Sequence, residues 1–511
     1  MISEKNDARR GQLRQKGVIM NEYKKEYLKK IDKCIASGRY KDNWESLSQY
    51  RVPDAYRDCK FGVFIHWGIF SVPAYANEWY SRSMYVQGTR EFEHHVKTYG
   101  PQKDFGYKDF IPMFKAEKFN ADEWTDLFKE AGFQYMVPVA EHHDGFQMYE
   151  TGVSHWNSVE MGPHRNVLGE LHAAARKKGL LAGCSSHRVE HWFFMGPGRE
   201  FESDITDAEK EGDFYWPAMP SGDFNDSFST PTPTPDFVED WLVRCCELVD
   251  RYKPSIFYFD WWIHHSAVKP YLRKFAAYYY NRAEEFGIPA VINYKHEAFA
   301  FGTAVPDVER GKFADVKPYV WQTDTATAYN SWCHTTENKY KDPVDLVQNL
   351  IDIVSKNGRL LLNIGPKADG TICDEDVAIL KAIGRWMKAN GEAIYNSTVW
   401  RSSGEGPTKT IEGQFAEGNQ AAYTPEDIRF TAGNGCVYAF ILKWPEDGRV
   451  TIKSLAEAAP GNMPVFSGIV SDITALGFDS KIDVTRDSSG LHISAPDIKT
   501  SYPVTFKISV D

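Results

Sequence analysis

Six short runs of apolar residues recur between about residue 60 and residue 390, and segments with helical periodicity lie between them. Runs without polar alternation are typical of strands that are buried on both faces. This many strand–helix repeats, over about 330 residues, favour a closed (β/α)8-like barrel over an open sheet. Fewer than eight strands are recognisable, so closure of the barrel is an inference. The runs cover residues 61–67, 134–140, 180–186, 255–260, 289–295 and 359–365.

Helix start and stop signals between these runs support this pattern. Asn120 can cap a helix that Gly132 stops. A second helix is predicted over about residues 342–356, because it opens with Asp-Pro and is followed by Asn-Gly. A third is predicted over residues 238–252, where apolar residues have heptad-like spacing.

After about residue 395 the pattern changes to alternating apolar and polar residues, as in 435–444, 449–455 and 504–510. Turn sequences separate these stretches, which predicts an antiparallel β-sandwich of roughly 110 residues. The long insertion 193–235 is rich in Gly, Pro, Ser and Thr, which is typical of a binding lid or a partly disordered loop. The expected domains are a polar, helical extension (1–50), a catalytic barrel (51–394) and the C-terminal sandwich (395–511).

Composition narrows the class of protein. The 511 residues exceed one ordinary domain, and 42% hydrophobic with 25% charged residues is a globular composition. The excess of 70 acidic over 59 basic residues, which are interspersed, argues against a nucleic-acid or anionic-membrane partner. Aromatic residues make up 14% of the chain, which suits either a large core or a ligand with one apolar and one hydroxyl-rich face, such as a sugar.

Cysteine usage and the N-terminus bear on cofactors and compartment. The eight cysteines have neither zinc-ligand spacing nor a regular disulfide pattern. Residues 1–30 lack the apolar stretch of a secretory signal, and no run is long enough to span a membrane. The expectation is therefore a cytoplasmic protein as written, or a periplasmic or secreted one if a leader was removed. The composition neither requires nor excludes a homo-oligomer.

Polar residues cluster at the ends of the predicted strands, where the reactive groups of a parallel barrel lie. They are His66 and Trp67, then Glu141, His142, His143 and Asp144, then His187, Asp260, Lys295, His296 and Glu309.

Asp260 stands between Phe259 and Trp261, where an ionised carboxylate is costly unless something requires it. It can cap the following helix, or it can serve as the nucleophile of a glycosidase, which must stay ionised beside an aromatic ring. Glycosidase chemistry also needs a second carboxylate to protonate the leaving oxygen. The candidates are Glu78, Glu190, Glu297, Glu309 and Asp324.

The adjacent histidines in VAEHHDGF raise the alternative of a metal site. Neighbouring residues on a strand point to opposite faces, so His142 and His143 can share a metal only if the strand has ended by Glu141. Neutral imidazoles around a pocket are better suited to binding hydroxyl groups. No metal or cofactor is therefore expected, and a metallohydrolase remains a third alternative.

Three long segments carry a resemblance to a known family: KFGVFIHWGIFSVPAYANEWYSRSMY (60–85), EHHDGFQMYET (141–151) and LVQNLIDIVSKNGRLLLNIGPKADGTI (346–372). On the basis of these segments, the chain resembles the alpha-L-fucosidases of glycoside hydrolase family 29 from about residue 50 to near its C-terminus. The resemblance implies a (β/α)8-like barrel followed by a β-sandwich. It also implies metal-independent, retaining exo-hydrolysis of terminal alpha-L-fucosides through a covalent fucosyl-enzyme intermediate, with a fucosylated oligosaccharide or glycoconjugate as substrate.

The resemblance implies roles for individual residues. Asp260 would be the nucleophile and Glu309 the acid/base, with Glu297 as the reserve candidate for the latter. The residues implied in substrate binding are His66, Trp67, Glu78, Trp79, His142, His143, His187, Lys295 and Trp321, of which Trp67 and Trp321 would help to wall the pocket.

Several positions depart from the family pattern. Lys295 stands where an arginine is common, and it cannot form a bidentate contact. Cys184-Ser185-Ser186 replaces Tyr-Tyr-Ser before His187, and Gln322 follows Trp321 where glutamate is common. Two alternatives therefore stay open: a related exo-glycosidase acting on an alpha-L-galactoside or a substituted fucose, and a non-catalytic fucose-binding protein on the same scaffold.

Overall fold

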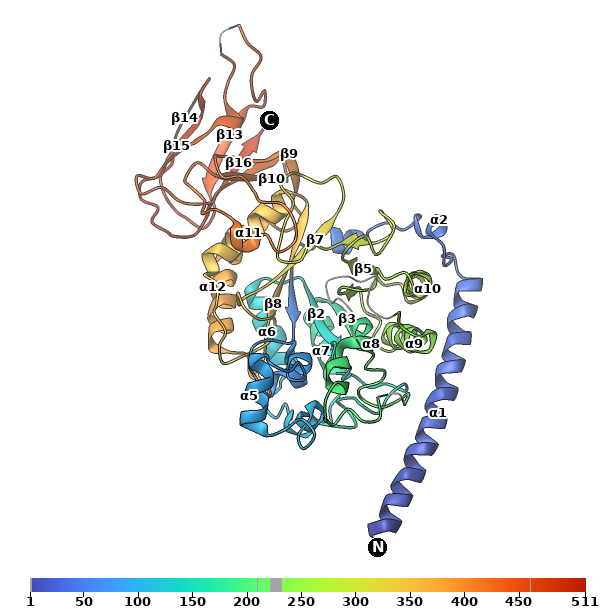
Figure 1. Cartoon of the computed structure of the whole chain (residues 1–511). Helices are drawn as coiled ribbons and strands as arrows, with labels where there is room; N and C mark the ends of the chain where they lie inside the picture. Colours follow the sequence, from blue (N-terminus) through green and yellow to red (C-terminus); the bar gives the residue numbers. More distant parts are fainter. Residues whose placement is uncertain (1, 209, 221–231, 460) are drawn as a thin grey trace.

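The computed structural model of the chain describes residues 2–208, 210–220, 232–459 and 461–511. Within these residues a barrel forms the centre of the molecule, and antiparallel sheets form a C-terminal part beyond it (Figure 1). A long N-terminal helix runs along the outside of the barrel. Among the described residues, no helix is both long enough and apolar enough to cross a membrane.

Eight parallel strands form the barrel sheet in the order β6-β5-β4-β3-β2-β1-β8-β7. Its two edges meet through a parallel bridge between Asp307 and Gln322, beside which the Val308 N–H donates to the Gln322 carbonyl at 2.9 Å. The predicted (β/α)8-like barrel is thus confirmed. The strands are β1 (Phe61–Ile65), β2 (Tyr135–Glu141), β3 (Leu181–Ser186), β4 (Ile256–Phe259), β5 (Val291–Tyr294), β6 (Val305–Pro306), β7 (Trp321–Ala326) and β8 (Gly358–Ile364).

The apolar runs predicted β1 to β5 and β8 but missed β6 and β7. β6 is only two residues long, so it leaves no pattern. β7 has the sequence WQTDTA and is polar although every residue in it is buried. Its polar side chains find partners inside the barrel, since Gln322 Oε1 accepts from the Tyr56 hydroxyl at 2.9 Å and Asp324 Oδ2 from the Tyr258 hydroxyl at 2.8 Å.

The predicted helix boundaries follow their caps. The Asn120 side chain accepts hydrogen bonds from the first turn of α6, and Gly132 ends that helix with a left-handed backbone of φ 91°. No helix lies between β5 and β6 or between β6 and β7, so residues 307–320 run as an irregular segment over this side of the barrel. The helices of the barrel region are α2 (Trp44–Leu47), α3 (Asp54–Arg57), α4 (Tyr80–Ser83), α5 (Arg90–Tyr99), α6 (Ala121–Ala131), α7 (Val167–Lys177), α8 (His191–Phe194), α9 (Pro235–Tyr252), α10 (Lys269–Phe286), α11 (Pro343–Ser355) and α12 (Asp374–Asn390).

The C-terminal part contains a five-stranded and a three-stranded antiparallel sheet, in the orders β13-β16-β11-β10-β9 and β12-β15-β14. The period-two pattern has its physical cause here, because alternate residues such as Val504, Phe506 and Ile508 are buried in a shared apolar core. The strands are β9 (Thr398–Glu405), β10 (Ile428–Gly433), β11 (Cys436–Ile441), β12 (Arg449–Ile452), β13 (Val470–Ala475), β14 (Asp483–Asp487), β15 (Gly490–Ser494) and β16 (Val504–Val510).

A buried carboxylate ties this C-terminal part to the barrel. Asp352 on α11 is fully buried and forms ion pairs with Lys312 at 3.2 Å, Lys356 at 2.8 Å and Arg429 of β10 at 2.5 Å. Three cations outweigh the effect of burial and hold the pKa of Asp352 well below its usual range. The contact fixes the C-terminal sheet against the barrel.

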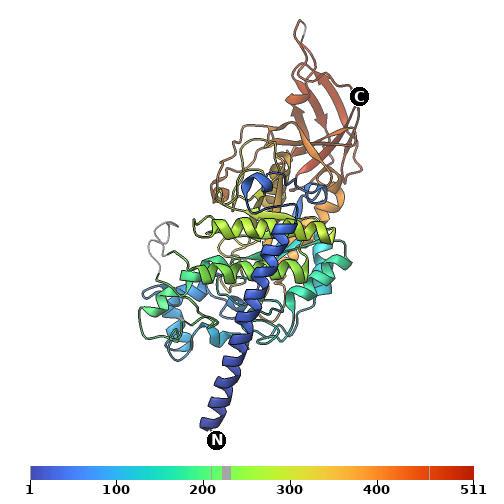
Figure 2. The ribbon, with the colours of Figure 1, turned by 90° about the vertical axis from the view of Figure 1, so that its right-hand side faces the viewer.

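The N-terminal helix α1 (Ile2–Ser37) crosses the outer faces of α9 and α10 and projects beyond the barrel (Figure 2). Its C-terminal half is anchored by apolar and polar contacts. Ile31 is completely buried, and the Tyr23 hydroxyl donates to Glu247 on α9 at 2.7 Å.

The close packing of α12 on α6 generates the first prediction. A Cβ atom at Gly384 would lie 2.3 Å from the backbone carbonyl oxygen of Glu130, so this helix contact requires glycine. Alanine normally stabilises a helix interior by about 1 kcal/mol relative to glycine. Here we expect Gly384→Ala to lower the free energy of unfolding by about 1–3 kcal/mol, because backbone must move to accept the methyl group.

Chemical denaturation monitored by circular dichroism measures this change. Gly418→Ala is the matched control, since a Cβ there meets no atom within 4 Å. An unchanged or raised midpoint for Gly384→Ala would contradict the packing argument.

Candidate active site

The carboxyl-terminal ends of the barrel strands surround a cavity of about 480 Å³, which is a normal size for a small-ligand site. Below it the barrel interior is filled by side chains such as Phe64, Tyr135 and Val137, so the cavity has a closed floor. It is lined by Phe64, His66, Glu78, Trp79, His142, His143, His187, Glu190, Tyr258, Asp260, Trp261, Trp262, His264, Lys295, His296, Glu309, Asp324, Trp332 and Phe415.

Four histidines from the ends of β1, β2 and β3 form one side of the cavity: His66, His142, His143 and His187. Neighbouring rings lie close together, with centroids 4.8 Å apart for His142 and His187 and 5.5 Å for His66 and His142. Burial lowers the pKa of His143 to about 3 and those of His66 and His142 well below the usual value. The imidazoles of His66, His142 and His143 are therefore neutral and can both donate and accept hydrogen bonds.

The end of β2 explains why adjacent histidines face the same cavity. The strand stops at Glu141, so the alternation of faces does not extend to the pair that follows it. Nδ1 of His142 has no hydrogen-bond partner among the described residues, so it is available to a ligand.

Asp260 lies at the end of β4 and is held from two sides. One carboxylate oxygen is 3.0 Å from Nδ1 of His187 and 3.6 Å from Nε2 of His143, and the other is 3.3 Å from Nζ of Lys295. Burial alone would raise its pKa, but Lys295 and the imidazoles hold the pKa of Asp260 well below its usual range. Asp260 does not cap a helix, because α10 begins only at Lys269.

Glu309 follows β6 and faces Asp260 across the same ammonium group. Its Oε2 atom accepts from Lys295 Nζ at 2.6 Å and from the Trp261 indole N–H at 2.6 Å. Burial, together with Asp324 and Asp260, outweighs the effect of Lys295 and raises the pKa of Glu309 to about 7. Two neighbouring carboxyl groups thus have opposite pKa shifts, which is the signature of divided acid and nucleophile roles.

Lys295 stands at the end of β5 and makes separate contacts in place of the bidentate contact of an arginine. Besides Asp260 and Glu309, its ammonium lies 3.4 Å from Asp324 of β7. Burial opposes its charge, but these carboxylates raise the pKa of Lys295 well above its usual value. The side chain is 2% exposed, so it is a buried permanent charge among carboxylates.

Glu78 and Trp79 also line the cavity. Glu78 is buried and accepts a hydrogen bond from the Trp332 backbone N–H at 3.0 Å, while burial raises its pKa. The Trp79 ring packs edge-on to His143, with centroids 5.6 Å apart. Trp332 packs against His66 at 5.4 Å, so aromatic rings stand beside the imidazoles.

Two predicted pocket residues lie elsewhere. Trp67 packs among Phe114, Phe119 and Trp124 in the core, and its indole N–H donates to the Lys367 carbonyl. Trp321 is the first residue of β7, at the opposite end of the strand from the cavity, and it is completely buried. Neither tryptophan lines the cavity. The side chain of Trp67 turns outward into the core, and Trp321 stands at the start of its strand, away from the carboxyl-end opening.

The structure also gives the positions of two other predicted features. Glu297, the reserve acid/base candidate, is exposed and does not line the cavity. The described part of the insertion 193–235 supplies no lining residue either, and its residues Phe193 and Phe194 are buried against the barrel instead. Residues 221–231 of the proposed lid lie outside the described residues.

Sequence reasoning missed other lining residues. Trp261 and Trp262 follow Asp260 directly, so their position after a strand end was the signal that could have found them. Phe415 carries no such signal, because it lies in the connection between β9 and β10 of the C-terminal part, far from any barrel strand in the sequence.

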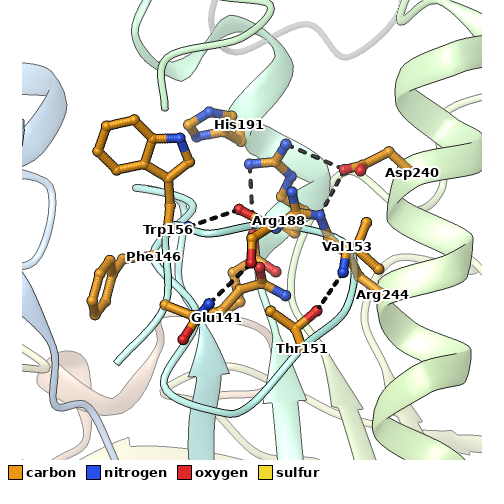
Figure 3. A network of polar contacts seen from close by, with 12 residues as sticks. Glu141, Phe146, Thr151, Val153, Trp156, Arg188, His191, Asp240 and Arg244 are labelled. Carbon is orange, nitrogen blue, oxygen red and sulfur yellow. Dashed lines mark hydrogen bonds and ion pairs between the residues drawn. The ribbon is translucent and has the colours of Figure 1, made fainter. Parts of the chain in front are cut away.

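A buried ionic network supports the strand ends that carry the histidines (Figure 3). Glu141 accepts from Arg244 at 3.0 Å and lies 3.5 Å from Arg188, while Asp240 contacts Arg244 at 2.7 Å and Arg188 at 3.4 Å. Two carboxylates and two guanidinium groups balance each other. Nδ1 of His191 also lies 2.7 Å from the His143 carbonyl oxygen, so these contacts hold the chain at the end of β2.

The same histidines could in principle hold a metal ion. Among the described residues, ligand atoms of His66, His142 and His187, and of His143, His187 and Asp260, lie within 4.8 Å of one another. Both ring nitrogens of His187 already have protein partners, Asp260 and the Ser185 hydroxyl, each at 3.0 Å. The arrangement therefore suits hydrogen bonding to a polyhydroxyl ligand better than metal coordination.

A closed-floor cavity with two carboxyl groups of opposite pKa shift, neutral imidazoles and aromatic walls has the groups that sugar cleavage needs. Fold and site together define the class of the protein, which is a glycoside hydrolase.

Comparisons with known proteins identify the family. A model of the alpha-L-fucosidase family matches residues 28–392, and a model of the alpha-L-fucosidase C-terminal domain matches residues 420–509. Tissue alpha-L-fucosidase of Rattus norvegicus is 30% identical over 491 residues, which cover 93% of this chain and 92% of the rat protein. The human tissue enzyme is 29% identical over 476 residues, covering 91% and 89%.

A solved structure agrees with these matches. The crystal structure of Thermotoga maritima alpha-fucosidase in complex with fucose superposes with a TM-score of 0.70 and 29% identity, covering 92% of this chain and all of that chain. The chain belongs to the alpha-L-fucosidase family.

The ionic network of Glu141, Asp240, Arg188 and Arg244 leads to the second prediction. Glu141→Gln would leave two buried guanidinium groups with a single carboxylate, Asp240. We expect the free energy of unfolding to fall by about 3–5 kcal/mol, because a buried charge loses its partner. Thermal or chemical unfolding measures the effect.

Glu150→Gln provides the matched control, since this side chain is 60% exposed and lies 3.7 Å from Arg251. We expect a change below about 1 kcal/mol for it. Equal stabilities of the two variants would show that the network contributes nothing to the fold.

Proposed function

We propose that the protein is a retaining exo-alpha-L-fucosidase, which releases terminal alpha-L-fucosyl residues from glycans through a covalent intermediate. The observation that carries this proposal is the shared ammonium of Lys295. Asp260 and Glu309 oxygens lie 3.3 and 2.6 Å from it, so these two oxygens cannot be further apart than the sum of these distances. That limit is below the roughly 6.5–9.5 Å carboxyl separation of inverting enzymes and is compatible with the roughly 5–5.5 Å of retaining ones.

The opposite pKa shifts of Asp260 and Glu309 support the following roles. Asp260, held ionised, attacks the anomeric carbon and displaces the leaving oxygen, which takes the proton of Glu309. A covalent fucosyl ester on Asp260 results. Glu309, now ionised, removes a proton from water as the water attacks the same carbon, which restores both carboxyl groups and releases fucose.

Lys295 and the imidazoles position the nucleophile and the sugar. The Lys295 ammonium stabilises the carboxylate of Asp260 before attack and that of Glu309 after proton transfer. His66, His142 and His143, with Glu78, offer neutral and acidic groups for the sugar hydroxyls, and Trp79 offers an apolar face. The closed floor of the cavity admits a terminal residue only, which supports exo-action.

Two substitutions test the roles. Asp260→Ala should abolish hydrolysis of an aryl alpha-L-fucoside, and azide should restore turnover with a fucosyl azide of inverted configuration, because azide then replaces the missing nucleophile. Glu309→Ala should reduce kcat/KM roughly 10²- to 10⁴-fold on disaccharides, whose leaving groups need protonation. It should affect fucosyl fluoride much less.

Glu297→Ala is the control for Glu309, because it removes an exposed carboxylate outside the cavity. Equal losses of Glu309→Ala on good and poor leaving groups would refute the acid role. Faster cleavage of alpha-L-galactosides than of alpha-L-fucosides would show that the preferred sugar is galactose and not fucose.

A pH profile tests the protonation states. The acid must carry its proton, so with a pKa of about 7 for Glu309 we expect kcat/KM on a disaccharide to fall about tenfold per pH unit above pH 7. Fucosyl fluoride requires no acid, so its alkaline limb should be absent. A disaccharide profile that stays flat to pH 9 would contradict the assignment.

A further inference from the structure

The wall of the cavity has two zones of different character. The inner zone is buried and polar: His66, His142, His143 and Lys295 are each at most 3% exposed. The outer zone is aromatic and half-exposed, and it includes Trp261, His296 and Phe415, the last of which is 51% exposed. A sugar bound in the inner zone would direct its leaving group toward this aromatic mouth.

The aromatic mouth is continuous with the proposed acid. The rings of Phe415 and Trp261 lie nearly parallel, 22° apart in orientation and 5.7 Å between centroids, and His296 lies 4.0 Å from Trp261. The Trp261 indole in turn donates to Glu309. The group that protonates the leaving oxygen therefore stands at the border between the two zones.

Phe415 is held near the cavity by backbone hydrogen bonds of residues 413–417, called here the C-terminal segment. Gly413, Phe415 and Glu417 donate their N–H groups to the carbonyls of Lys312 at 3.1 Å, Glu309 at 2.8 Å and Arg310 at 2.9 Å respectively. The two segments approach so closely that a Cβ on Gly311 would lie 1.9 Å from the Gly413 carbonyl oxygen. This pairing holds the backbone of Phe415 beside that of Glu309, and its ring lies against Trp261.

Unusual backbone conformations concentrate at the same mouth. Trp262, His296 and Phe415 have positive φ values of 69°, 49° and 56°. Bulky residues rarely adopt this conformation, and they keep it mainly where the surrounding structure holds them for a function. In addition, Nε2 of His296 is buried without a hydrogen-bond partner among the described residues, so a ligand hydroxyl can engage it.

We propose that Phe415, Trp261 and His296 form the binding subsite for the leaving group, and that this subsite takes a pyranose residue. A pyranose ring presents an apolar C–H face for the stacked aromatic rings and hydroxyls for His296. The C-terminal segment thereby takes part in substrate selection. The inference rests on the proposed fucosidase function, since it names the acceptor side of that site.

Phe415→Ala tests the subsite on three fucosyl substrates. Fucosyl fluoride needs neither acid nor leaving-group binding, methyl alpha-L-fucoside needs the acid alone, and a fucosyl-hexopyranose disaccharide needs both. We expect kcat/KM to fall roughly three- to tenfold on the disaccharide, as for the loss of an aromatic contact. Both other substrates should be unaffected, and Phe415→Trp should restore the disaccharide rate.

The matched control is Phe301→Ala, which removes an exposed phenylalanine (69%) that does not line the cavity. An equal loss on methyl fucoside and disaccharide would show that Phe415 only positions Glu309, and unchanged rates on all three would show no subsite; either result overturns the proposal. Inactivity of the unsubstituted protein on fucosyl fluoride would instead refute the proposed function.

Discussion

The site depends on a single buried cation. Lys295 lies within 3.4 Å of carboxylate oxygens of Asp260, Glu309 and Asp324, and one ammonium cannot balance three ionised carboxylates out of water. Burial and the neighbouring carboxylates Asp324 and Asp260 raise the pKa of Glu309. Asp260 has two imidazoles as additional partners and stays ionised, whereas Glu309 has only the Trp261 indole and is protonated up to about pH 7. The pKa values of Asp260 and Glu309 are thus shifted in opposite directions.

The surroundings of this cation are buried where the sugar would bind and more exposed where the leaving group would exit. At the ends of β2 and β3, beside the histidines, the carboxylates of Glu141 and Asp240 are paired with the guanidinium groups of Arg188 and Arg244. On the other side, the absence of helices between β5 and β7 leaves residues 307–320 without a regular cover. The C-terminal segment fills that space by pairing with Glu309 and its neighbours. The C-terminal part is therefore joined to the site by this backbone pairing, and to the rest of the barrel through Asp352.

Much of this could be predicted from the chain, because the determinants are local. Apolar runs gave six strands, and the caps at Asn120 and Gly132 gave helix limits. Position at strand ends brought together Asp260, the histidines and Lys295 without any knowledge of their contacts. β7 escaped detection because its polar residues are satisfied by partners such as Tyr56 and Tyr258, which are remote in sequence. Trp67 and Trp321 were wrongly predicted to line the cavity, because a match to a family motif does not show in which direction a side chain points.

The sequence by itself determined the barrel, the sandwich-like C-terminal sheets, the family and the presence of Asp260 in a desolvated strand end, since periodicity, caps and motifs are written in neighbouring residues. Only the tertiary structure decided which carboxyl group carries a proton, because that depends on burial and on charges brought together from β4, β5, β6 and β7. It also decided that Phe415 lies at the mouth of the cavity. That residue stands more than a hundred positions after Glu309, and only backbone pairing between the two segments brings it there.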